Sequence, residues 1–226
     1  MVIAKRARSN EQKGERREEI LVAAEAFLEK KSFHRIGIAD IAAQAGMAKG
    51  TVFLYFKTKE ELFLAIAARE FEQWFDEMDR SFAGIAGSPG KEARNRVLNS
   101  LSKMLEPDAH LINLIPIVHT VLEQNIRYPQ AREFKRMLGR RLPHTGALLE
   151  GCLPFLRPGQ GVTFLLWMYA LVIGFLHLAT PAPVIKKVFQ KEPALRMMQI
   201  DFGASYPDAL GAILDGWKAQ NRGRKK

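Results

Sequence analysis

The sequence predicts an all-α protein, in which a small N-terminal unit of three helices precedes a larger helical domain. Apolar residues recur every three or four positions along most of the 226 residues, as on the buried face of a helix. No run of alternating apolar and polar residues indicates a strand. Apolar residues make up 47% of the chain, which is enough to build a core in both parts.

The N-terminal unit is predicted from one amphipathic helix and two short ones. The first helix is expected from Glu15 to Lys31, with a stripe formed by Ile20, Leu21, Ala24, Phe27 and Leu28. Short helices at 38–45 and 48–56 follow, separated by Gly46, which tolerates the positive φ of a tight reversal. The residues expected to face inward are Ile41, Met47, Val52 and Phe56, with Ala42 and Ala45 small enough for the helices to cross closely.

The rest of the chain is predicted as longer helices joined by short breaks. Thr58 is a candidate N-cap and Glu61 completes a capping box, so a helix is expected from there to about Arg80. The glycine-rich stretch 84–90 is predicted as a loop. Further helices are expected near 91–105, 108–125, 129–153, 161–180 and 203–221, with a short helix and irregular chain at 184–202. Pro143 is expected to kink or split the third of these.

The two short helices have the form of a helix-turn-helix. Its second helix is expected to expose a cation, a hydroxyl, apolar surface and an aromatic ring, from Lys49, Thr51, Phe53, Leu54 and Tyr55. This mixture suits the major groove of DNA, where lysine meets guanine acceptors and apolar atoms meet the thymine methyl. The alternative is a helical enzyme in which residues 38–56 are only a structural hairpin.

This segment resembles the TetR/AcrR family of transcriptional regulators. The likeness covers about residues 15–65 and rests on Asp40-Ile-Ala-Ala-Gln-Ala-Gly-Met-Ala-Lys-Gly-Thr51, Tyr55-Phe56 and Lys59-Glu60-Glu61-Leu62. The resemblance implies that Tyr55 and Lys59 bind phosphates. It implies groove contacts for Lys49, Gly50, Thr51, Phe53 and Leu54. Ile38 and Ala48 stand where the family often has Thr and Ser, so two capping hydroxyls are expected to be missing.

The positive charge of the chain is concentrated at its two ends. The net charge is +10, and residues 1–17 carry six Lys or Arg against two Glu, while residues 222–226 carry four more cations. Flexible basic ends can reach a polyanion, or they can serve only solubility. We therefore expect a basic flexible arm at 1–14, a helix-turn-helix DNA-binding domain at 15–62, an effector-binding and dimerisation domain at 63–221, and a basic tail at 222–226.

The larger domain contains an apolar stretch that allows two interpretations. Residues 162–180 hold no Lys, Arg, Asp or Glu and approach the length of a membrane span, so a membrane-associated helical protein is one alternative. A helix that is apolar all round also fits packing on its own domain and on a partner. Ala170 and Gly174 lie one turn apart and would admit a symmetry mate. We therefore expect this helix and 203–221 to form the interface of a homodimer, with no membrane contact.

A second, weaker resemblance, through Thr120–Asn125 and Ala131–Met137, is to the C-terminal domain of one AcrR-like branch. It implies effector binding and pairing through the last two long helices. Polar groups on otherwise apolar helices suggest an apolar pocket for a small molecule between the helices near 108–125 and 161–180. The candidates are Asn113, His119, Thr120, Trp167, Tyr169 and His177, for each of which packing in the core is the alternative.

The chemistry of enzymes finds little support in the sequence. The five histidines lack metal-ligand spacing, and no glycine-rich phosphate loop or nucleophile motif is present. Cys152 lies among apolar residues that are expected to bury it and to raise the pKa of its thiol. The sequence thus predicts a cytoplasmic regulator without cofactor or metal, binding a double-stranded DNA operator and an apolar effector. The resemblance implies a repressor that is released from a palindromic operator.

Overall fold

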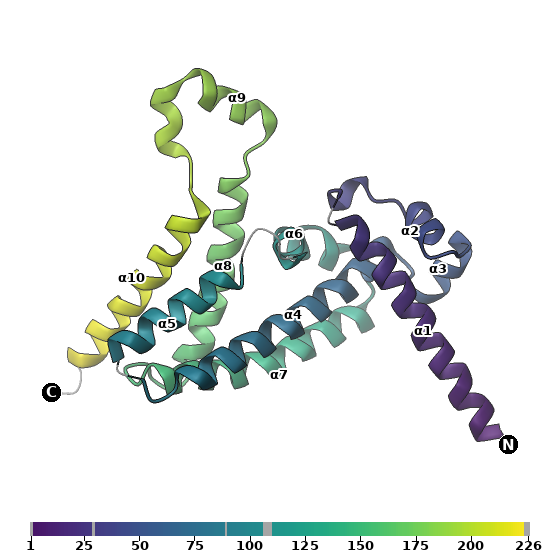
Figure 1. The fold of residues 1–226 in the computed structure, drawn as a ribbon, viewed down its shortest axis with the longest axis horizontal. Helices are drawn as coiled ribbons and strands as arrows, with labels where there is room; N and C mark the ends of the chain where they lie inside the picture. Colours follow the sequence, from purple (N-terminus) through teal and green to yellow (C-terminus); the bar gives the residue numbers. More distant parts are fainter. Residues whose placement is uncertain (1, 29, 89, 106–109, 224–226) are drawn as a thin grey trace. The chain divides into compact units, whose positions relative to one another are not determined.

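The computed structural model describes residues 2–28, 30–88, 90–105 and 110–223, and this part of the chain is helical without a strand. It divides into two compact units. The first consists of residues 1–71 and 110–135, and the second of residues 72–109 and 136–226. Two long helices, α4 (Lys59–Ile85) and α7 (Tyr128–Cys152), contribute to both units (Figure 1). Each unit is described separately below.

The first unit begins with α1 (Val2–Leu28), the 3-10 turn η1 (Phe33–Arg35), α2 (Ile38–Gln44) and α3 (Lys49–Tyr55). The N-terminal part of α4 follows. The unit is completed by α6 (His110–Ile117), the π-helical turn η2 (Val118–Leu122), the 3-10 turn η3 (Glu123–Asn125) and the start of α7. Helix α1 packs against α2 and α6, and α2 packs against α3.

Helix α1 is longer than expected at its N-terminal end. The residues expected as a basic flexible arm are helical from Val2 onward, so the first helix begins well before the predicted Glu15. The predicted stripe is buried at Ile20, Leu21, Ala24 and Leu28, while Phe27 is only half-buried. Residues 11–19 of the helix are exposed. Burial thus starts where the apolar period starts, and Lys13, Arg16 and Arg17 lie in the exposed stretch before it.

The helix-turn-helix forms as predicted, with different capping from that expected. Gly46 has a φ of 64° in the turn, and Ile41, Val52 and Phe56 are buried. The N-cap of α2 is Gly37, not Ile38, and the Gly37 N–H donates to the Asp40 carboxylate (3.3 Å). Ala48 is the N-cap of α3 and supplies no side-chain bond. A capping hydroxyl is therefore missing at Ala48, as expected. At α2 the N-cap position is Gly37, one residue before the expected Ile38.

The second unit contains the rest of α4 and α7 with α5 (Gly90–Lys103), α8 (Gln160–Ala179), α9 (Pro183–Lys191), the 3-10 turn η4 (Pro193–Met198) and α10 (Phe202–Gly223). Helix α10 packs against α8 and α5. The core of the second unit consists of Phe82, Ile85, Val97, Leu101, Leu149, Leu153, Phe164, Leu165, Met168, Val172, Tyr206, Leu210 and Leu214. Segment α9–η4 projects beyond the ends of α8 and α10 (Figure 1).

Two of the expected helices differ from the structure at a proline. Pro143 does not split α7, which continues from Tyr128 to Cys152. The single helix expected at 108–125 is instead α6, η2 and η3 in succession, with Pro116 near the end of α6. A proline inside a helix removes one backbone donor and crowds the preceding turn, which favours the change of helix type here. Of the expected basic tail, Arg222 lies within α10, and residues 224–226 lie outside the described residues.

Helices α7 and α8 cross at a pair of glycines. A Cβ on Gly161 would lie 2.1 Å from the carbonyl oxygen of Gly146, which excludes any larger residue without backbone movement. The Gly161 N–H donates to the Glu150 carboxylate (2.8 Å), so α7 also caps the start of α8. Cys152 near the end of α7 is buried, and burial raises the pKa of its thiol, as expected.

Candidate nucleic-acid interface

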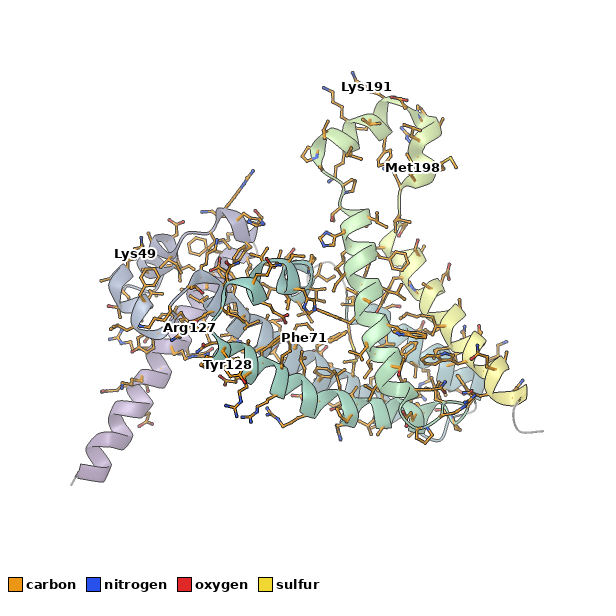
Figure 2. The ribbon with its side chains drawn as sticks, turned by 180° about the vertical axis from the view of Figure 1, so that it is seen from behind. Lys49, Phe71, Arg127, Tyr128, Lys191 and Met198 are labelled. Atoms are coloured by element: carbon orange, nitrogen blue, oxygen red, sulfur yellow. The ribbon has the colours of Figure 1, made fainter. Side chains whose placement is uncertain are left out.

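The candidate groove residues of α3 lie at the surface of the first unit. Lys49, Gly50 and Leu54 are exposed, with Leu54 at 74% of its full accessibility. Thr51, Phe53 and Tyr55 are half-buried, whereas Val52 is fully buried and fixes the inner face of the helix. Figure 2 shows Lys49 at the outside of this unit. The structure therefore presents the predicted cation, hydroxyl and apolar groups on one short helix.

Lys59 has bonds inside the unit that the sequence did not indicate. Its ammonium donates to the carbonyl oxygens of Phe33 (2.8 Å) and Ile36 (3.1 Å) and lies 3.9 Å from the centre of the Phe33 ring. Desolvation lowers the pKa of Lys59, although the nearby Glu60 carboxylate opposes this. Two of the three ammonium donors thus hold the η1 segment, which leaves one for a phosphate.

Lys57 is a candidate contact that the sequence analysis missed. It is exposed, follows α3 directly after Phe56, and its ammonium donates to the Phe53 carbonyl oxygen (2.9 Å). The sequence contains the indication, because a lysine two residues after Tyr55 lies at the same end of the second helix of the helix-turn-helix. A lysine at this position can bind a phosphate as a point charge.

The basic part of α1 is anchored to the helix-turn-helix. The guanidinium of Arg17 lies 5.1 Å from the centre of the Phe56 ring, a cation–π contact with a core residue at the end of α3. Arg69 on α4 pairs with Glu18 and Glu25 on α1. These contacts fix the C-terminal half of α1, from which the exposed cations Lys13 and Arg16 extend.

The turn between α3 and α4 is a hydrogen-bonded cluster. Thr58 caps α4 as predicted, since its hydroxyl accepts the Glu61 N–H (3.0 Å). The Glu61 carboxylate does not return to the Thr58 N–H as in a regular capping box, but accepts the N–H of Lys57 (2.9 Å). The same carboxylate binds Arg127, at the start of α7, through Nε (2.6 Å) and Nη2 (3.1 Å).

The six candidate effector residues are divided between the two units. Asn113, His119 and Thr120 belong to α6 and η2 of the first unit, and all three are exposed. His119 contacts the Glu123 carboxylate (3.0 Å), and the Thr120 hydroxyl donates to the Pro116 carbonyl oxygen (3.0 Å).

The other three candidates lie on α8 in the second unit. Trp167 and His177 are exposed and Tyr169 is half-buried. The rings of Trp167 and Trp217 lie 5.0 Å apart. The six candidates therefore form two separate sets, each of which needs its own test.

Helix α8 has one buried and one open face. Phe164, Leu165, Met168 and Val172 are buried, whereas Leu166, Trp167, Ala170, Gly174 and Leu178 are exposed. By length and composition α8 qualifies as a candidate membrane span, the one such helix in the described part of the chain. Such a helix is also what a soluble protein buries in a partner, because apolar surface of this size is rarely left in water.

Two family models match almost the whole chain. Residues 20–66 match the model described as bacterial regulatory proteins of the tetR family. Residues 68–221 match the model for a tetracyclin repressor-like C-terminal domain. This protein belongs to the TetR family. The resemblance stated from the helix-turn-helix is thereby confirmed, and it extends to the larger domain.

Several curated proteins are similar to parts of this TetR-family chain. The fatty acid metabolism regulator protein of Bacillus subtilis is 29% identical over 93 residues, which is 41% of this chain and 47% of that protein. The HTH-type transcriptional repressor KstR of Mycolicibacterium smegmatis is 29% identical over 105 residues, or 46% of this chain and 50% of KstR. The chain spans about half the length of these relatives or less.

A solved structure gives the same fold over most of the chain. A TetR-family transcriptional regulator from Mesorhizobium loti has a TM-score of 0.54 and 14% sequence identity, and the match covers 91% of this chain and 96% of that one. The predicted all-α architecture, with an N-terminal helix-turn-helix and a C-terminal helical domain, is confirmed.

Proposed function

We propose that this protein is a ligand-responsive transcriptional regulator that binds a double-stranded DNA operator as a homodimer. The main support for this function is that α3 exposes a face with candidate groove residues, in a chain that both family models match. This support favours a regulator over a helical enzyme and over a membrane-associated protein. Repression is the proposed mode, since the relatives include a transcriptional repressor. A regulator bound to the bacterial chromosome acts in the cytoplasm.

In this proposal α3 is the recognition helix, and some of its residues contact bases while others contact phosphates. Lys49, Gly50, Thr51, Phe53 and Leu54 are proposed to face the major groove. Tyr55 and the remaining donor of Lys59 are proposed to bind phosphates, joined by Lys57. The exposed cations of α1, among them Lys13 and Arg16, add attraction for the duplex that does not depend on sequence.

The homodimer is proposed to form through the open faces of α8 and α10. Ala170 and Gly174 are exposed one turn apart on α8, and α10 exposes Ala212, Gly216 and Ala219 at similar spacing. Small residues on both helices allow close approach between two copies, while Leu166 and Trp167 supply apolar area. Because a two-fold dimer carries two recognition helices, the operator is expected to be a near-palindrome.

The effector is proposed to be a largely apolar small molecule. The name of the Bacillus subtilis relative, a fatty acid metabolism regulator, supports this class of ligand. The apolar character of α8 is compatible with it. Variants of Asn113, His119 and Thr120 should be tested separately from variants of Trp167, Tyr169 and His177, because the two sets belong to different units.

The DNA-binding function is tested by selecting duplexes from a random-sequence pool with the purified protein. The expected result is one enriched near-palindrome whose half-site centres are about 34–36 Å apart or a multiple of this distance. Footprinting should then protect both half-sites, and sedimentation should show a dimer. Enrichment of no sequence would contradict the proposed function, whereas an asymmetric site bound by a monomer would contradict only the dimeric arrangement.

A further inference from the structure

The turn that follows the recognition helix is tied to the start of α7 by a buried carboxylate. Glu61, in the first turn of α4, is 3% exposed. Its Oε1 accepts Nε of Arg127 (2.6 Å) and its Oε2 accepts Nη2 (3.1 Å), and the Arg127 backbone N–H lies 3.4 Å from Oε1. A bidentate guanidinium–carboxylate pair fixes orientation as well as distance. All of these atoms lie within the first unit.

The same carboxylate holds the chain directly behind α3. Its Oε2 accepts the N–H of Lys57 (2.9 Å), two residues after the last residue of α3. Phe56, between them, is a core residue. The direction in which α3 leaves the core therefore depends on where the Glu61 carboxylate lies. Arg127 restricts that position, because its guanidinium donates to both oxygens of the carboxylate.

A second bond joins the same two segments. The Thr58 hydroxyl, which caps α4, donates to the carbonyl oxygen of Asn125 (3.1 Å), two residues before Arg127. The junction of η3 and α7 is thus bonded to the start of α4 at two neighbouring points. Figure 2 shows Arg127 and Tyr128 at this junction.

The charges of the pair are unequally buried. The Glu61 side chain is almost enclosed, at 2% exposure, while 51% of the Arg127 side chain remains accessible. The hydrogen bonds from Arg127 lower the pKa of Glu61, so the carboxylate stays ionised at neutral pH. Removing the guanidinium would leave a buried charge whose remaining partners are the backbone N–H groups of Lys57 and residue 127, which favours movement of Glu61 toward water.

We propose that Arg127 is a positioning residue for DNA binding, which holds the recognition helix in its binding orientation through Glu61 without contacting DNA. This inference rests on the proposed function. Arg127 lies outside the helix-turn-helix, 66 residues along the chain from its partner. The orientation of the proposed DNA-binding surface of α3 therefore depends on the residue that directly precedes α7.

The test compares the affinities of variants for the duplex that the unmodified protein selects from a random pool. Arg127→Ala and Glu61→Gln are each expected to weaken binding about tenfold, the order of effect for residues coupled through one network. The double variant should bind no more weakly than the weaker single variant. Hydrogen exchange of the Lys57 amide should become faster in Arg127→Ala, because the Glu61 carboxylate that accepts its N–H is no longer held in place. Glu60→Gln, one residue away, is the control for Glu61→Gln.

The salt dependence of binding separates positioning from direct contact. If Arg127 does not bind a phosphate, Arg127→Ala shifts the affinity and leaves the slope of log K against log salt unchanged. A slope reduced by about 1 would show a direct phosphate contact and overturn the proposal. Arg132→Ala, which removes an exposed cation of α7 close to Arg127 in the chain, is the control for loss of charge.

A second control tests whether any loosening of α4 against α7 has the same effect. Arg141 on α7 pairs with Asp76 (2.6 Å) and Asp79 (3.0 Å) on α4, within the second unit. Arg141→Ala should lower the unfolding temperature but change the affinity less than twofold. Equal losses in Arg141→Ala and Arg127→Ala would overturn the proposal.

The remaining outcomes separate failure of the inference from failure of the proposed function. If Arg127→Ala does not fold, Arg127→Lys takes its place, because lysine keeps the charge but not the paired donors. A folded Arg127 variant with unchanged affinity overturns the inference alone. Failure of the unmodified protein to select any duplex overturns the proposed function and the inference with it.

Discussion

Helices α3 and α8 both present side chains to solvent, but they present different chemistry. The seven residues of α3 expose Lys49, Gly50 and Leu54 beside half-buried Thr51 and Tyr55. The twenty residues of α8 expose an apolar face that includes Leu166 (50%), Trp167 (47%) and Leu178 (60%). The partner of α3 can be argued from residue identity, because hydrogen bonds in a groove are directional. The partner of α8 cannot, because the hydrophobic effect is proportional to area and has no direction.

This difference explains why the sequence of α8 is compatible with several kinds of partner. A second copy, an apolar ligand and a lipid bilayer each remove apolar surface from water, at roughly 25 cal/mol per Å² for any of them. Only shape separates these partners, through the small residues Ala170 and Gly174 on the open face. The contrast between α3 and α8 would be contradicted if a charged residue on the open face of α8 left the association of two copies unchanged.

The largest effect is expected from Ala170→Arg. In the proposed dimer this substitution buries an unpaired guanidinium between two apolar faces, so the dimer should dissociate. Each monomer would then bind one half-site alone, and operator affinity should fall by about 10²-fold or more, since the gain from joining two binding modules is lost. Sedimentation velocity and fluorescence anisotropy measure the two effects.

The control is the same substitution at another exposed alanine of the second unit. Ala83 lies on α4, away from α8 and α10 in sequence, and is exposed. Ala83→Arg should leave both the dimer and operator affinity unchanged. A dimeric Ala170→Arg protein would show that two copies associate elsewhere and would leave the open face of α8 to another partner.

A smaller effect is expected where the inner face of α8 meets α7. Gly161→Ala places a methyl group 2.1 Å from the Gly146 carbonyl oxygen, so the helices must separate. The free energy of unfolding should fall by about 1–3 kcal/mol, as for other overpacked cores. Urea titration followed by circular dichroism measures it.

Gly139→Ala on α7 is the matched substitution at an open position. Gly139 is an exposed helical glycine, and a Cβ there would meet no atom within 4 Å. Alanine should stabilise the helix by about 0.5–1 kcal/mol because it restricts the unfolded chain. If Gly161→Ala were equally stabilising, the close crossing of α7 and α8 would be contradicted.

The sequence predicted features that depend on neighbouring residues and missed those that depend on residues far apart in the chain. The apolar stripe, Gly46 and the Thr58 cap act over one or two helical turns, and the structure confirms them. The bonds of Lys59 to the η1 segment and of Glu61 to Arg127 join positions 23 to 66 residues apart. Periodicity carries no information about such pairs. Lys59 was expected to bind a phosphate and Glu61 to complete a capping box, and neither expectation indicated a partner elsewhere in the chain.

The helical arm and the broken α6 region show two further limits. Residues 1–14 were expected as a basic flexible arm ahead of the first helix, yet a helix whose formation is supported by a buried stripe can extend beyond that stripe, and α1 begins at Val2. Pro116 and Pro143 carry the same local signal, but only the first is followed by a change of helix type. Packing of the surrounding turns, which the sequence does not give, decides between these outcomes.

The smallest effect on operator affinity is expected on α3, where Tyr55→Phe removes one hydroxyl and keeps the ring. If this hydroxyl binds a phosphate, affinity should fall by about 0.5–1.5 kcal/mol for every duplex, because phosphate contacts carry no sequence information. The salt slope should not change, since a neutral hydroxyl releases no counterion. Lys49→Ala is the comparison, with an expected loss of discrimination of about 1–3 kcal/mol at one base pair of each half-site.

The two variants are measured on the selected duplex and on a set of duplexes with single base-pair changes. Tyr55→Phe should lower all affinities in parallel, so the order of preference among the duplexes is kept. Lys49→Ala should change that order at one position, because its ammonium is exposed on α3 and free to meet a base edge. If Tyr55→Phe changed the order while Lys49→Ala kept it, the groove-facing and phosphate-facing sides of α3 would have to be exchanged. The recognition helix would then lie in the groove with the other side inward.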